Sequence, residues 1–72
     1  MNQAILLNDD LTFDGQDWQL TGLYSGQLLN IRIKTTQQTY SESLKFDIEI
    51  AIEDWLEDNE PESSSEIVIF LD

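Results

Sequence analysis

Residues 42–58 constrain the fold more than any other segment, because apolar side chains recur there about every 3.6 residues. The apolar residues on this helical stripe are Leu44, Ile48, Ala51, Ile52, Trp55 and Leu56. Acidic residues such as Glu53 and Glu57 fall outside the stripe. This division into an apolar face and a charged face is typical of an amphipathic helix that packs against a core. We therefore predict a helix over residues 42–58.

The ends of this segment support a helix, although its centre has a second pattern. Capping candidates precede the stripe at Thr39, Ser41 and Ser43, and the stop signals Asn59 and Pro61 follow it. The second pattern is the strict alternation of Phe46, Ile48, Ile50 and Ile52, which is typical of a strand. No turn signal interrupts residues 41–58, so a helix is the favoured interpretation. A strand over residues 46–52 is the alternative.

The segments around the helix have the patterns of strands. The predicted strands are residues 4–8, 18–24, 28–35 and 66–71. Apolar and polar side chains alternate in the third of these, as in a strand with one buried face. Ser25-Gly26-Gln27 predicts a hairpin turn before it, and Asp14-Gly15 predicts an earlier turn. The last strand is a nearly continuous apolar run, which predicts that it is covered on both faces or lies inside the sheet.

The order of these elements predicts an α+β fold, β-β-β-α-β, with one acidic amphipathic helix packed on an antiparallel sheet. The 72 residues form a single domain, and a 40% hydrophobic content is sufficient for a small core. The chain has no cysteine, so no disulfide stabilises this core. The N-terminal apolar run, Ala4 to Leu7, is too short for a signal peptide or a membrane span, so we expect a cytoplasmic protein.

The charge of the chain limits its partners. Fifteen acidic and three basic residues give a formal net charge of −12. Residues 42–72 hold eleven of the acids and one of the bases, a net charge of −10. Such a field repels nucleic acids and anionic membranes and attracts basic surfaces. We expect no direct binding to nucleic acid or membrane, and a basic protein surface as the partner.

The chain offers little for catalysis or metal binding. It contains neither histidine nor cysteine, so no Ser-His-Asp or Cys-His arrangement can form. Residues 10–21 match a calcium loop at Asp10, Asp14 and Gly15, but they fail to match at the third position, Thr12, and at the twelfth, where Thr21 replaces the expected bidentate glutamate. We expect a protein that is not an enzyme, with no catalytic residues, no metal and no cofactor.

The acidic residues within and after the predicted helix are the candidate partner-binding site. They are Glu49, Glu53, Asp54, Glu57, Asp58, Glu60 and Glu62. Carboxylates three or four positions apart on a helix lie at intervals comparable with successive phosphates along a strand. One interpretation is a nucleic-acid mimic that blocks the basic groove of a DNA- or RNA-binding protein, as anti-restriction and anti-CRISPR inhibitors do. The alternative is a face that serves only solubility.

Three large apolar residues are candidates for a separate contact: Trp18, Phe46 and Ile50. Trp18 belongs either to the core or to an exposed interface anchor. Phe46 and Ile50 fall among the acidic residues, where they are either covered by the sheet edge or a loop, or exposed to a partner. In the alternative function, an apolar surface of this kind forms a homodimer or binds as a regulatory subunit.

Several short motifs are shared with one bacterial family. They are "MNQAI" at residues 1–5, "LTFD" at residues 11–14, Gly26 followed by Ile31 and Ile33, and "FDIE" at residues 46–49. With these motifs the chain resembles the family called domain of unknown function 1488. The resemblance implies a meander of strands, an acidic helix that opens with Phe-Asp-Ile-Glu, and a final strand. It implies no activity.

Overall fold

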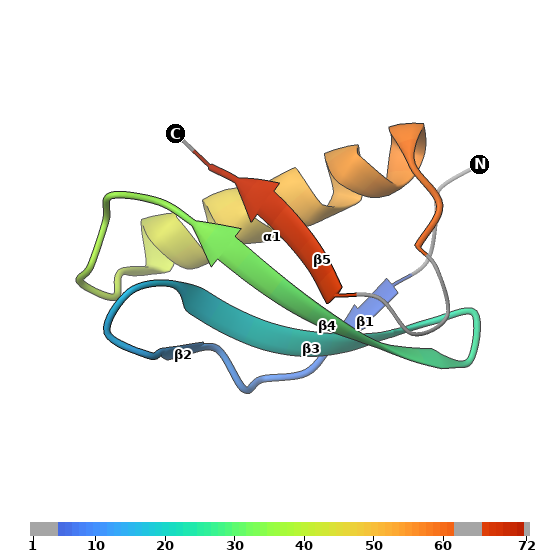
Figure 1. Ribbon diagram of the computed structural model, residues 1–72, viewed down its shortest axis with the longest axis horizontal. Coiled ribbons are helices and arrows are strands. Elements are labelled where there is room, and N and C mark those ends of the chain that lie inside the picture. Colours follow the sequence, from blue (N-terminus) through green and yellow to red (C-terminus); the bar gives the residue numbers. More distant parts are fainter. Residues whose placement is uncertain (1–4, 62–65, 72) are drawn as a thin grey trace.

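A computed structural model describes residues 5–61 and 66–71 of the chain, which form two layers. The elements in chain order are β1 (Ile5–Leu7), β2 (Thr12–Phe13), β3 (Trp18–Tyr24), β4 (Gln27–Lys34), α1 (Glu42–Asp58) and β5 (Glu66–Phe70). The strands form one sheet, and α1 crosses one of its faces (Figure 1). The predicted α+β fold is therefore confirmed.

The sheet is mixed, whereas an antiparallel sheet was expected. Its strand order is β1-β3-β4-β5, and β2 pairs with β3 beside β1. The pairs that involve β3 are antiparallel, but β5 runs parallel to β4, with Ile33 opposite Ile69. A helix of 17 residues lies between β4 and β5 and carries the chain back along the sheet, so β5 starts at the same end as β4. Strand β2 is an addition to the expected order.

Two turns have the conformations that their sequences indicate. The hairpin between β3 and β4 is closed by Ser25 and Gly26, whose φ angles are 53° and 77°. Two consecutive positive φ angles define the type I′ turn that matches the twist of a hairpin. In the turn between β2 and β3, Gly15 has a φ of 98°. The Asp14 carboxylate accepts hydrogen bonds there from the backbone N–H groups of Gln16 and Asp17, at 2.9 and 2.8 Å.

Helix α1 spans the predicted residues, and the strand alternative for residues 46–52 is wrong. Among the three capping candidates, Ser41 is the N-cap, and its Oγ accepts a hydrogen bond from the Leu44 N–H at 3.0 Å. At the other end, Asn59 has an extended backbone and its side chain donates to the Trp55 carbonyl at 2.9 Å. These contacts satisfy backbone groups that a helix leaves free at its ends.

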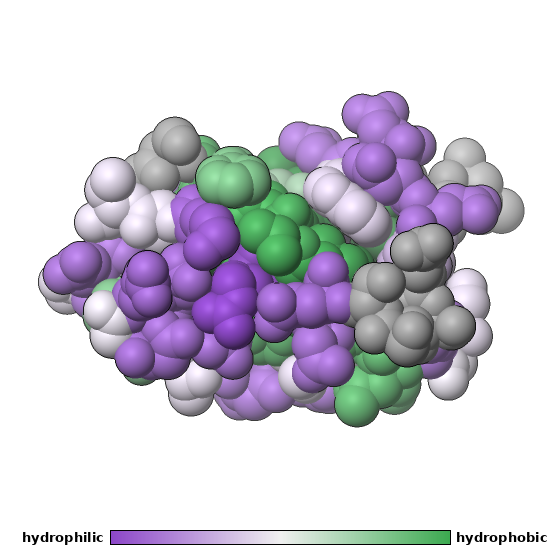
Figure 2. Space-filling view, in the orientation of Figure 1, coloured by the Kyte–Doolittle hydropathy of each residue, from purple (hydrophilic) through white to green (hydrophobic). Residues whose placement is uncertain are grey.

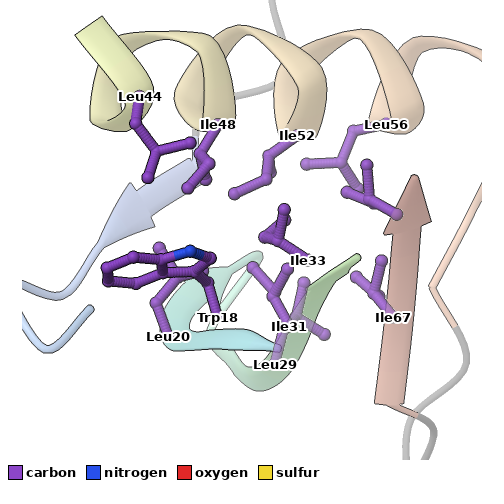
Figure 3. Packing of buried hydrophobic residues seen from close by; sticks show 11 residues of the cluster. Trp18, Leu20, Leu29, Ile31, Ile33, Leu44, Ile48, Ile52, Leu56 and Ile67 are labelled. Carbon is purple, nitrogen blue, oxygen red and sulfur yellow. The ribbon is translucent and has the colours of Figure 1, made fainter. Parts of the chain in front are cut away.

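The core lies between α1 and the sheet. The helix contributes Leu44, Ile48, Ile52 and Leu56, and the strands contribute Trp18, Leu20, Leu29, Ile31, Ile33, Ile67 and Ile69 (Figure 3). Trp18 is only 5% exposed, and its indole N–H donates to the Gln37 carbonyl at 2.9 Å. The hypothesis that Trp18 is an exposed contact is therefore wrong, because burying its ring stabilises the core and its N–H has a partner.

Strand β5 differs from its prediction. It lies at the edge of the sheet, and its burial alternates, with Ile67 and Ile69 buried while Val68 and Phe70 are exposed. The expectation that it is covered on both faces or lies inside the sheet is therefore wrong, since the described helix covers only the face that holds Ile67 and Ile69. The helical part of the described chain contains no segment with the length and apolar character of a membrane span.

Candidate functional site

The outward face of α1 carries a band of exposed carboxylates. Its members are Glu53, Asp54, Glu57, Asp58 and, just beyond the helix, Glu60, and we call them the acidic band. They are exposed because the opposite side of the same helix supplies the buried stripe, which fixes the rotation of α1 about its axis. The structure thus places five of the seven predicted site residues on one continuous surface.

The other two predicted acids stand apart. Glu49 is half-buried on the flank of α1 that lies towards β1, where it lines a small hollow of about 70 Å³ with Asn8, Asp9 and Lys45. Its carboxylate faces this flank, so it is at the border of the acidic band. Glu62 lies outside the described residues.

No basic residue neutralises the acidic band. All three basic side chains of the chain are paired elsewhere: Arg32 and Lys34 on the open face of the sheet, and Lys45 with Asp9 at 3.6 Å. Within residues 5–61 and 66–71, no ion pair involves a carboxylate of the acidic band. Carboxylates three or four residues apart repel each other, so the band is a local concentration of negative potential.

An apolar pair interrupts this charged surface. Phe46 is 61% exposed and Ile50 is 41% exposed, and they are neighbours because four residues are about one turn of a helix. Neither the sheet edge nor a described loop covers them, so the interpretation that they are covered is wrong. Two exposed apolar side chains next to Glu53 and Glu57 form a small anchor within a charged rim, as in many protein interfaces.

The open face of the sheet carries an ion-pair network that sequence reasoning did not predict. The Asp17 carboxylate, in a residue only 6% exposed, accepts hydrogen bonds from Arg32 and Lys34, both at 3.1 Å. Arg32 also contacts Asp14 and Glu66, at 3.3 Å each. The carboxylates of Glu66, Asp17 and Asp14 raise the pKa of Arg32. These residues are far apart in the sequence, so only the strand register brings them together.

The two aspartates of the calcium-like segment act in local structure. The backbone N–H groups of Asp17 and Gln16, followed by the side chains of Gln19 and Arg32, lower the pKa of Asp14 from 3.8 to about 2. The hydroxyl and then the backbone N–H of Thr21 lower the pKa of Asp10. In the described part of the chain, no three potential acidic ligands are grouped as a metal site.

Asp10 also lines a hollow of about 310 Å³ on the open face of the sheet, together with Thr12, Gln19, Thr21, Asn30 and Glu66. Hydrogen bonds from Thr21 occupy both oxygens of the Asp10 carboxylate, at 3.0 and 2.6 Å. Ion pairing with Arg32 engages Glu66. The carboxylates of this hollow therefore stabilise the strands and their connections.

In comparisons with known proteins, no family model matches the chain, and no curated protein and no solved structure is significantly similar to it. The resemblance to domain of unknown function 1488 stays a prediction. The function must therefore be argued from the surfaces of this chain alone.

Proposed function

We propose that this protein is a non-catalytic interaction module whose acidic band binds the basic groove of a DNA- or RNA-binding protein. In this proposal it acts as a nucleic-acid mimic, in the manner of anti-CRISPR or anti-restriction inhibitors. The observation that carries the proposal is the exposed band of Glu53, Asp54, Glu57, Asp58 and Glu60, which has no ion-pair partner among the described residues. A cytoplasmic location, where such partners act, belongs to the same proposal.

The spacing of the carboxylates supports a groove that normally holds a phosphate backbone. Within the acidic band, Glu53 and Glu57 are four residues apart, and so are Asp54 and Asp58, which corresponds to a rise of about 6 Å per step along a helix. Lysine and arginine side chains that line a nucleic-acid groove are arranged to meet negative charges in such a row. The protein then gains affinity by replacing the counterions of the groove, so its binding falls steeply with salt concentration.

The exposed apolar pair gives this surface a contact that is not electrostatic. Phe46 and Ile50 lie beside the acidic band and can enter a pocket or pack on the aliphatic stems of the groove residues. A residual affinity at high salt should therefore depend on Phe46. This contact would also distinguish one basic partner from another, because charge alone selects weakly.

The experiment is a capture of binding proteins from a bacterial lysate at low salt, followed by elution with a salt gradient and with competing DNA. We expect a nucleic-acid-binding protein that is displaced by both. Purified partner is then tested against Glu53→Gln/Glu57→Gln and against Gln16→Lys/Gln38→Lys, which have the same net charge. Gln16 and Gln38 are exposed and lie outside the band. Loss of binding only in the first variant supports the proposal, and equal loss in both contradicts it.

A second candidate function rests on apolar residues of the open sheet face. Leu6, Leu23 and Leu28 are 72%, 42% and 56% exposed and lie side by side, because Leu23 is paired with both of the others. We propose as the alternative that this leucine row joins two copies or a larger assembly, while the acidic band serves solubility. Sedimentation at several protein concentrations tests this. A dimer that Leu23→Lys dissociates favours the alternative, and a monomer excludes the homodimer.

A further inference from the structure

One edge of strand β5 has no strand beside it in the described part of the chain. The strand pairs only with β4 among the described strands. The Leu71 N–H bonds to the Lys34 carbonyl at 3.0 Å, and backbone groups of a strand alternate in direction. Ile67 and Ile69 therefore direct their N–H and C=O groups towards β4, whereas those of Val68 and Phe70 point away from the sheet. The outward-pointing groups of Val68 and Phe70 form a row of hydrogen-bond donors and acceptors along this edge.

The side chains of β5 do not protect this edge. Val68 is 38% exposed and Phe70 is 73% exposed, and no charge or proline lies between Ile67 and Leu71. Figure 2 shows a band of hydrophobic surface along β5, with hydrophilic side chains on both sides of it. Natural edge strands usually carry a lysine, a proline or a bulge that prevents pairing with another chain. An unprotected edge of this kind suits strand addition by a partner.

The flank of α1 above this edge is acidic. Lys45 and Glu49 face Asp9 on the β1 side, and β1 and β5 are at opposite edges of the sheet. A helix turns by about 100° per residue, so Asp54 and Asp58 lie on the other flank, together with the half-buried Trp55. Helix α1 contacts β5, and Figure 3 shows Leu56 near the strand that carries Ile67.

We infer that the β5 edge binds an extended segment of a partner protein in which apolar residues alternate with lysine or arginine. The segment becomes an additional strand of the sheet and bonds to the backbone groups of Val68 and Phe70 that point away from β4. Its apolar side chains pack beside Val68 and Phe70 on the open face. Its basic side chains lie on the helix side, where their aliphatic stems cover Trp55 and their charges meet Asp54 and Asp58.

The charge of the chain favours this occupant over a second copy. If two β5 edges paired about a twofold axis, both helices would lie on the same face of the joined sheet. The acidic flanks with Asp54 and Asp58 would then face each other, in chains that each have a net charge of −12. Like charges at close approach oppose such pairing. A basic segment instead neutralises the flank.

The test uses a synthetic peptide of about seven residues with blocked ends, in which valine and lysine alternate. A peptide of the same length, in which valine and glutamate alternate, is the control. Amide hydrogen exchange by NMR is the first readout. In the free protein, the Val68 and Phe70 amides should exchange rapidly while those of Ile67 and Ile69 are protected. The lysine peptide should protect Val68 and Phe70, and the glutamate peptide should not. Protection of these amides in the free protein, with a dimer in sedimentation, overturns the inference.

Affinity of the peptide for variants is the second readout. Val68→Lys should weaken binding by about tenfold or more, since it places a lysine on the edge. Leu28→Lys makes the same change at an exposed apolar residue of the open face away from β5, and should change the affinity by less than about twofold. Equal effects of these two variants, or no binding at all, would overturn the inference.

A second pair of variants separates this inference from the proposed function, on which it does not depend. Asp54→Asn/Asp58→Asn should weaken binding of the lysine peptide by about tenfold, because it removes two carboxylates of the β5 flank and leaves only the exposed Asp47, which precedes Asp54 by about two helical turns. Glu53→Gln/Glu57→Gln has the same net charge and should leave it nearly unchanged, although it should abolish binding to a basic groove. A peptide affinity that falls equally in both variants would show a general charge attraction and would contradict strand addition at β5.

Discussion

The carboxylate of Asp14 makes the stability of the protein sensitive to acid. Its pKa is about 2 in the folded chain, below the value of 3.8 of an unperturbed aspartate, because the N–H groups of Asp17 and Gln16 bond to the charged form. A lowered pKa stabilises the fold fully above the unfolded value, and this contribution is lost as the pH falls from about 4 to about 2. Asp14→Asn keeps an acceptor for the turn but does not titrate.

We therefore expect the free energy of unfolding of the native protein to exceed that of Asp14→Asn by a constant amount above about pH 5, and this difference to shrink towards pH 2. Denaturant unfolding monitored by tryptophan fluorescence at several pH values measures it. Asp9→Asn is the control, since the Asp9 side chain is 94% exposed. A difference that stays constant down to pH 2 would contradict the assignment.

Asp17 should matter more for stability than any exposed carboxylate. Its side chain is 9% exposed and accepts bonds from two cations, Arg32 and Lys34. Asp17→Ala leaves both cations without this acceptor, and hydrogen bonds to charged groups are worth about 1.5–3 kcal/mol. Since Lys34 is 38% exposed, we expect a loss near the lower end, about 2 kcal/mol. Asp9→Ala, which removes only the exposed partner of Lys45, should cost less than about 0.5 kcal/mol in the same denaturant titration.

At the scale of the element, the two ends of α1 are unequal. Ser41 caps its start, but the last turn holds Glu57 and Asp58 and no basic residue. Negative charge near a helix C-terminus is unfavourable, so the acidic band lowers the stability of the helix that carries it.

The charge at the end of α1 can be tested by Asp58→Lys, which should raise the free energy of unfolding by about 0.5 kcal/mol in low salt. The gain should decline as salt screens the helix dipole. Glu42→Lys is the matched control, because Glu42 lies in the first turn, where the same charge reversal should destabilise. Equal effects of the two substitutions would mean that overall repulsion rather than the helix dipole determines the change.

The elements differ in how far the sequence predicted them. The bounds of α1 followed from a long 3.6-residue repeat and from polar residues at its ends, because a helix with one buried stripe has few other solutions. The placement of β5 did not follow. Val68 and Phe70 have the same apolar character as Ile67 and Ile69, so the residues of this strand do not show that one face is uncovered. The direction of β5 depends on the path of the helix before it.

The sequence likewise predicted only part of the candidate site. Glu53 and Glu57 were placed correctly because charged residues on a helix face away from the core. The position of Glu49 at the β1 flank depends on how the helix lies across the sheet, which is a tertiary property. The network around Asp17 and Arg32 depends on the register between β3 and β4. No local pattern in the sequence contains that information.

At the scale of the whole molecule, the two layers differ in charge. Residues 42–58, which form the helical layer, contain seven carboxylates and one lysine, a net charge of −6. On the sheet, Arg32 and Lys34 are paired with Asp14, Asp17 and Glu66, so this group is close to neutral. The protein therefore presents its negative field mainly from the side of α1, and under the proposed function this field would orient it towards a basic surface before contact.

This distribution predicts how salt changes the stability of the protein. Repulsion among the carboxylates of α1 opposes folding and is screened over about 10 Å at 0.1 M salt, whereas the pairs of Asp17 are partly buried and are screened less. Added sodium chloride should therefore raise the melting temperature between about 0.01 and 0.5 M. The variant Glu53→Gln/Glu57→Gln should have a higher melting temperature at low salt, and added salt should raise it less, because part of the repulsion is removed. The variant Gln16→Lys/Gln38→Lys has the same net charge, and its melting temperature should rise with salt more nearly as that of the native protein does. A melting temperature that falls with salt would mean that the ion pairs of the sheet contribute more to stability than the repulsion along α1 removes.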